Sequence, residues 1–201
     1  MHAKSGMKSV ERIRIVTING MLSALLFVLL YVGHLTPSEW TVIILVSYGC
    51  YLPYLFADTF FSGFSTVLAV NILGYVFIPR LTYVITFSFI SLYIPVRWVV
   101  RNRNPILRWS AKYVYYNFAF FVWLKVESTL LGIDIIGDTS KSINRLLDTL
   151  PLEINVSNFL VLIIVILFGN LFFTGYEILF EKVLQYARKW INRLIGGKDI
   201  F

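Results

Sequence analysis

The sequence predicts an all-α polytopic membrane protein, a bundle of six transmembrane helices with both termini in the cytoplasm. Hydrophobic residues make up 58% of the 201 residues and charged residues 14%, whereas a soluble domain has an apolar share of about 45–50%. The apolar residues gather in long stretches. About 20 apolar residues in an α-helix cross the hydrocarbon and satisfy their own backbone hydrogen bonds.

Six stretches have this length and character. In chain order they are Ile13–Val32, Thr41–Ala57, Phe60–Ile78, Thr82–Val99, Trp109–Leu131 and Asn158–Phe180. The first is longer than the hydrophobic region of a signal peptide and has no clean cleavage site, so we expect it to stay as a transmembrane helix. We therefore expect a single membrane domain: residues 1–12 as a cytoplasmic tail, 13–180 as the six-helix bundle, and 181–201 as a basic cytoplasmic tail.

Basic residues fall on alternate connections, which predicts the orientation. The N-terminus, the loop over 97–112 and the C-terminus are rich in Lys and Arg, whereas the connections over 33–40, 79–81 and 132–157 carry few. Positively charged loops stay on the cytoplasmic side. This places both termini inside, in a multi-pass protein of the plasma membrane. The formal charge of +7 is then explained by lipid anchoring rather than by nucleic-acid binding.

The connection over 132–157 contains a short amphipathic helix. Ile143, Leu146, Leu147 and Leu150 are spaced i, i+3, i+4, i+7, which is the pattern of one helical face. We expect Pro151 to end the helix. It either lies on the outer membrane surface or covers a cavity as a lid.

The C-terminal tail has a similar pattern. An apolar stripe that includes Trp190 lies opposite basic residues such as Arg188 and Lys189. The stripe fits the cytoplasmic headgroup layer or a partner subunit.

The fifth stretch contains two charged residues, Lys125 and Glu127. A charged group at the centre of a membrane helix costs about 2.5–3.5 kcal/mol on insertion scales, which a polar interior offsets. At about 100° per residue, Asn117 and Ser128 share one side of the helix, and Lys125 and Glu127 flank it at about 80° on either side. This polar arc predicts a solute cavity, although Lys125 also lies where its side chain can reach the surface.

Other polar residues are candidates for the same outer cavity. His34, Glu39, Trp40, Arg80 and Tyr83 border the first two outer loops, Asn71 lies in the third stretch, and Asn158 opens the sixth. Together they offer the charged, hydrogen-bonding and stacking contacts that bind a small polar or aromatic solute. Each also has a structural interpretation. Aromatic residues form interfacial belts, Arg80 can reach the membrane surface, and asparagines such as Asn71 and Asn170 join helices.

Signals for catalysis and for metal binding are absent from the sequence. Cys50 is the only cysteine and His2 and His34 are the only histidines, so no metal-site spacing occurs. No metalloprotease, hydrolase or phosphate-loop motif is present. We expect a protein that is not an enzyme and has no cofactor. Energy for any active transport would have to come from a partner protein.

The topology and the first helix resemble a known family. Arg12-Ile-Arg14 leads into the first predicted helix and Gly20-Met-Leu-Ser23-Ala24-Leu-Leu-Phe follows. This pattern, in a six-span chain of this length, resembles the substrate-binding S components of energy-coupling factor transporters. The family commonly has an Ala-x-x-x-Ala pattern that packs against a coupling subunit, and Gly20 and Ala24 have the same spacing. Small residues four apart allow close helix approach. Gly20 departs from the pattern by replacing the first alanine.

The resemblance implies the function. It implies a bundle that captures a vitamin or similar micronutrient from outside and associates with a transmembrane coupling subunit and two cytoplasmic ATPase subunits. Lys125 and Arg80 favour an anionic solute, and the aromatic residues favour a ring. Two alternatives remain: a non-catalytic scaffold of a cell-envelope or morphogenesis complex, and a self-sufficient small permease, for which no inverted repeat is visible.

Overall fold

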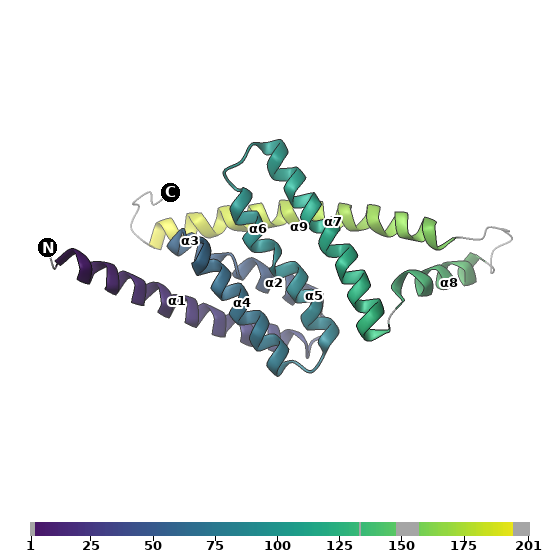
Figure 1. Cartoon of the computed structure of the whole chain (residues 1–201), viewed down its shortest axis with the longest axis horizontal. Helices are drawn as coiled ribbons and strands as arrows, with labels where there is room; N and C mark the ends of the chain where they lie inside the picture. Colours follow the sequence, from purple (N-terminus) through teal and green to yellow (C-terminus); the bar gives the residue numbers. More distant parts are fainter. Residues whose placement is uncertain (1–2, 133, 148–156, 195–201) are drawn as a thin grey trace. The chain divides into compact units, whose positions relative to one another are not determined.

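Helices make up all of the regular structure in the residues described, which are 3–132, 134–147 and 157–194 of this computed structural model (Figure 1). These helices are α1 (Ala3–Gly33), α2 (Glu39–Gly49), α3 (Leu52–Ala57), α4 (Phe60–Phe77), α5 (Leu81–Ser91), α6 (Tyr93–Val100), α7 (Pro105–Leu131), α8 (Ile135–Leu147) and α9 (Asn158–Leu194). The all-α class predicted from the sequence is confirmed.

Five helical segments in these ranges are long and apolar enough to cross a membrane. They are Ile13–Gly33, Glu39–Ala57, Phe60–Phe77, Leu81–Val100 and Asn158–Trp190. They match five of the six predicted stretches, and their composition is that of a membrane protein.

The remaining predicted stretch, Trp109–Leu131, forms most of α7 but is not among these five segments. Polar residues explain the difference. Asn117, Lys125 and Glu127 interrupt its apolar run, and several tyrosines lower its mean hydropathy further. The helix itself was predicted, whereas its role as a sixth membrane span stays a prediction.

Two of the apolar segments are broken, and a proline explains each break. Pro53 follows the interruption between α2 and α3, and Pro95 follows the interruption between α5 and α6. Proline has no backbone N–H, and its ring clashes with the carbonyl four residues earlier. Residues 49 and 91, the carbonyl positions four residues before these prolines, are the last residues of α2 and α5.

The chain forms two compact units. The first contains α1 to α6, the start of α7 up to Lys112, and the end of α9 from Arg188. Within it, α4 packs against α1, α3, α5 and α6, while α2 packs against α1 and α5. Val67 and Val70 of α4 are fully buried, as are Leu30, Val46 and Phe87 of the surrounding helices.

A side-chain hydrogen bond also joins α1 to α4 in this unit. The Asn19 amide donates to Ser62 Oγ at 2.7 Å.

The second unit contains α7 from Tyr113, α8, and α9 as far as Ala187. Tyr116 of α7 stacks on Phe173 of α9 with centroids 4.6 Å apart, and within α9 Phe173 stacks on Tyr176 at 6.5 Å. Gly169 makes room for this contact, because a Cβ there would lie 2.5 Å from the Tyr116 hydroxyl oxygen. The aromatic residues of α7 therefore fix its packing on α9.

The amphipathic helix predicted within 132–157 is present as α8 and begins before the predicted stripe. Asp134 caps it, since Asp134 Oδ1 accepts a hydrogen bond from the Gly137 N–H at 3.0 Å, the usual role of aspartate at a helix start. Gly137 is buried, whereas Leu146 is 68% exposed. The predicted stripe member Leu150 and the predicted end at Pro151 lie outside the described residues.

The residues of the predicted tail continue the last apolar segment as one helix. α9 runs without interruption over 37 residues, which is roughly 55 Å at 1.5 Å per residue. Residues 181–194 are therefore not a separate helix, and their predicted place in the cytoplasmic headgroup layer stays a prediction.

The basic loop predicted over 97–112 is also shorter than expected. Arg97 lies in α6 and Lys112 in α7, and both are buried.

Candidate functional site

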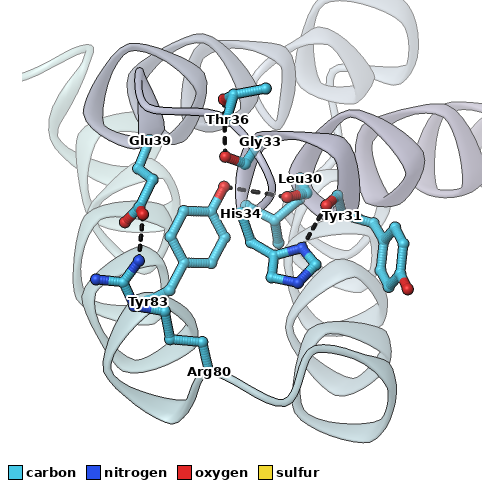
Figure 2. A network of polar contacts seen from close by, with 8 residues as sticks. All are labelled: Leu30, Tyr31, Gly33, His34, Thr36, Glu39, Arg80 and Tyr83. Atoms are coloured by element: carbon cyan, nitrogen blue, oxygen red, sulfur yellow. Dashed lines mark hydrogen bonds and ion pairs between the residues drawn. The ribbon is translucent and has the colours of Figure 1, made fainter.

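Tyr83 and Gly33 anchor a polar network at one end of the first unit, which we call the Arg80 end (Figure 2). The Tyr83 side chain is 3% exposed, and its hydroxyl donates to the Leu30 carbonyl oxygen at 3.0 Å. A Cβ on Gly33 would lie 2.6 Å from that hydroxyl. Only glycine leaves room here for α5 to approach the end of α1 this closely.

Arg80 and Glu39 form an ion pair at the same end (Figure 2). Arg80 precedes α5 and Glu39 is the first residue of α2, so the pair connects the starts of two helices. A carboxylate in the first turn of a helix also interacts favourably with the helix dipole. The Arg80 side chain is 55% exposed, and its guanidinium has further N–H donors beyond the one used by Glu39.

His34 lies between two aromatic rings. Its ring centroid is 5.0 Å from that of Tyr31 and 6.3 Å from that of Tyr83, and its Nδ1 is 2.5 Å from the Tyr31 carbonyl oxygen. A carbonyl oxygen only accepts hydrogen bonds, so Nδ1 carries the hydrogen and Nε2 of the neutral ring is an acceptor. Figure 2 shows this ring beside Tyr31 and near Tyr83.

Four of the residues predicted to border the outer loops therefore meet at the Arg80 end: His34, Glu39, Arg80 and Tyr83. The fifth, Trp40, is 56% exposed. Solute binding by this group stays a prediction.

Asn71 joins α4 to α5. Its amide donates to the Val67 carbonyl at 2.8 Å and to Ser91 Oγ at 2.9 Å, and its Oδ1 accepts from Ser88 Oγ at 2.6 Å. Both amide hydrogens are therefore used inside the protein, which matches the structural interpretation given for this residue above.

Asn117 of α7 makes a reciprocal contact with Asn170 of α9. Asn117 Nδ2 donates to Asn170 Oδ1 at 3.0 Å, and Asn170 Nδ2 donates to Asn117 Oδ1 at 3.1 Å. The second hydrogen of each amide goes to the carbonyl four residues earlier in its own helix, that of Tyr113 or Ile166. Asn117 can therefore bind a solute only through a remaining lone pair or by releasing Asn170.

The rest of the predicted polar arc on α7 divides into exposed and buried members. Lys125 and Ser128 are exposed, whereas Glu127 is 1% exposed. The Trp123 side chain hydrogen-bonds to the Glu127 carboxylate, and Glu127 Oε1 has no hydrogen-bond partner among the described residues. Trp123 stacks in turn on Phe120, with centroids 5.9 Å apart. Glu127 is thus the site candidate with the most unusual environment.

The predicted site residues Asn158, Gly20 and Ala24 are all exposed. Asn158 is exposed and is the first residue of α9, which Ser157 caps by accepting from the Leu160 N–H at 3.3 Å. Gly20 and Ala24 are exposed on α1, and a Cβ added to Gly20 would meet nothing within 4 Å. This face of α1 is open at the predicted partner position.

Sequence reasoning missed three charged residues that the structure buries. Arg97 is 7% exposed, with its guanidinium carbon 5.4 Å from the centroid of the Tyr51 ring, and Lys112 is 1% exposed, with its ammonium 5.2 Å from that of Trp109. Glu177 is fully buried in α9. Its position within an apolar stretch was a readable signal.

The candidate residues therefore form two groups, the Arg80 end in the first unit and the α7 residues from Asn117 onward in the second. That both groups line one cavity stays a prediction. Among the described residues, no group of three or more His, Cys, Asp or Glu side chains could hold a metal ion.

The fold and these residues define the class as a helical membrane protein that carries a buried carboxylate. Comparison with protein-family models, with curated proteins and with solved structures finds no match.

Proposed function

We propose that the chain is a membrane-embedded, substrate-binding subunit for the uptake of a vitamin or similar small micronutrient. It acts in the plasma membrane, with both termini in the cytoplasm, and separate coupling and ATPase subunits supply the energy. It has no catalytic role of its own.

The single observation that carries this proposal is Glu127. A covered carboxylate oxygen without a partner is unfavourable in a protein, and a membrane protein that keeps such a group commonly uses it for a ligand, an ion or a proton. Glu127 lies beside Trp123 on α7. This is the helix that the sequence analysis singled out because it contains two charged residues. A scaffold protein has no need for this group.

The open face of α1 supports the partner part of the proposal. Gly20 and Ala24 are exposed and four residues apart, and the space around Gly20 is free. A second helix can approach closely at such a position. The coupling subunit would bind here, as the family resemblance implies.

Native mass spectrometry of gently purified protein tests the proposal. We expect one small molecule per chain in wild type, and its loss in Glu127→Gln. Asp58→Asn is the matched control, since it makes the same chemical change at a side chain that is 63% exposed and paired with Arg101. Protein without a bound molecule, purified from cells grown in rich medium, would contradict the proposal.

A second candidate function is a non-catalytic scaffold, and a different observation favours it. Asn71, Asn117, Tyr83 and Arg80, all predicted to face a solute, have hydrogen-bonding or ionic partners inside the protein. If these contacts serve only packing, purification should yield protein partners and no small molecule.

A further inference from the structure

The Glu127 carboxylate needs a partner that the described residues do not supply. The residue is 1% exposed, and Oε1 has no hydrogen-bond partner, whereas Trp123 already bonds to the carboxylate. When the carboxyl is ionised, one neutral indole N–H leaves its negative charge uncompensated. A covered charge without a counter-charge is strongly disfavoured. The partner is therefore a proton, a metal ion or a positively charged ligand.

Lys125 is the nearest cation in the sequence, but it does not provide this counter-charge. Two residues along an α-helix turn by about 200°, so Lys125 and Glu127 project to nearly opposite sides of α7. The structure agrees, because Lys125 is exposed and Glu127 is not.

A metal ion is also a poor match for this position. Metal sites in proteins use several carboxylate, imidazole, thiolate or carbonyl ligands together. Around Glu127, as elsewhere in the described ranges, no cluster of three His, Cys, Asp or Glu side chains is present. A single carboxylate with an indole neighbour matches instead the small number of polar groups that orient an organic ligand.

We infer that Glu127 binds a positively charged nitrogen of an organic solute, one that carries N–H and donates a charge-assisted hydrogen bond to Oε1. The inference rests on the proposed function, and it names a cationic solute where the sequence favoured an anionic one. Arg80, one source of that anionic preference, is already paired with Glu39. The Trp123 ring, which bonds to the carboxylate and stacks on Phe120, provides the apolar side of such a site.

Access to Glu127 requires that the side chains covering its carboxylate move, because the residue is 1% exposed. Ser128, the next residue on α7, is exposed.

Three probes of similar shape and different charge test the inference: benzylamine, benzyl alcohol and benzoate. The rise in melting temperature of the purified protein measures how strongly each probe binds. Native mass spectrometry identifies any co-purified solute, and its chemical identity gives its charge. We expect a co-purified solute to be cationic and benzylamine to stabilise wild type more than the other two. Glu127→Gln should weaken amine binding by about ten- to a hundred-fold, the effect of one charge-assisted hydrogen bond.

Two variants keep the test independent of folding. Asp58→Asn should bind amines as wild type does. Glu127→Asp, which keeps the charge with a shorter reach, should retain the preference for the amine at lower affinity. Equal binding of benzylamine and benzyl alcohol by wild type would show that the carboxyl is neutral and would overturn the inference.

The results also separate this inference from the proposed function. A bound solute or probe that is neutral or anionic overturns only the cationic assignment. A protein that binds no small molecule of any charge overturns both.

Discussion

Asn117 and Asn170 exchange two amide hydrogen bonds, at 3.0 and 3.1 Å, between α7 and α9. Each amide also reaches back to its own helix, so every amide hydrogen of the pair has an acceptor. The arrangement fixes the register of the two helices, because a shift by one turn would break both contacts at once.

This pairing predicts energetic coupling between the two residues. Asn117→Ala and Asn170→Ala should each destabilise the protein, and the double variant should cost less than the sum of the two. Hydrogen bonds between membrane helices are worth on average about 0.6 and at most about 1.7 kcal/mol in double-mutant cycles. Equilibrium unfolding in detergent measures the coupling. Exposed Ser128→Ala serves as the control, and additive single effects would refute the coupling.

Gly63 and Gly20 should respond in opposite ways to alanine. A Cβ on Gly63 would collide with the Tyr54 ring, which is itself only 1% exposed, whereas Gly20 has free space around it. Overpacking costs about 1–3 kcal/mol, and alanine is a better helix former than glycine. We expect Gly63→Ala to lower the melting temperature and Gly20→Ala to leave it unchanged or raise it. A stable Gly63→Ala protein would show that the contact with Tyr54 can relax.

Tyr83 and Arg80 should differ in their contribution to stability. Tyr83→Phe removes a buried hydrogen bond to the Leu30 carbonyl, and such bonds contribute about 0.5–1.5 kcal/mol. Arg80→Gln breaks an ion pair whose arginine is largely exposed, which is typically worth less than about 1 kcal/mol and is reduced by salt. Unfolding at low and high salt distinguishes them, since only the Arg80→Gln effect should shrink with salt.

The orientation of the chain can be tested by cysteine labelling. Cys50 is buried, and Cys50→Ala provides the background. Ser142→Cys on α8 should react with an impermeant reagent in intact cells, whereas Arg103→Cys, in the connection before α7, should react only after permeabilisation. Both side chains are exposed. The reverse pattern would invert the topology.

The α1 face predicts where a partner binds. Gly20→Leu combined with Ala24→Leu should weaken co-purification of a membrane partner while leaving solute binding intact, because the bulky side chains keep a neighbouring helix away. Met21→Ala, an exposed position on the same helix, is the control. An unchanged partner yield in the double leucine variant would mean that the partner binds elsewhere.

The sequence predicts the helices well, because apolar runs of membrane length and their polar connections are local signals. The breaks at Pro53 and Pro95 are also local, but the prediction treated each segment as one helix. α7 was predicted correctly as a helix. Its polar residues keep it out of the five apolar segments, so its membrane crossing stays a prediction. The continuity of α9 was missed because its apolar and amphipathic parts differ in composition although no helix-breaking residue separates them.

The candidate site was less predictable, because hydrogen-bond partners are properties of the fold. The spacing of Lys125 and Glu127 showed that they cannot pair along the helix, and the structure agrees. Nothing in the sequence shows that Asn117 meets Asn170, 53 positions away. The burial of a charged residue likewise depends on side chains from other helices, which the local sequence does not show.

The length of α9 has a mechanical consequence. If α9 crosses the membrane, as its apolar residues predict, the hydrocarbon takes up only about 30 Å of its roughly 55 Å, and the rest of the helix extends beyond the bilayer. A tilt of about 10° within the bilayer would swing a tip about 40 Å from the midplane sideways by roughly 7 Å. A helix placed in this way would convert a small reorientation among lipids into a displacement large enough for a neighbouring protein to detect.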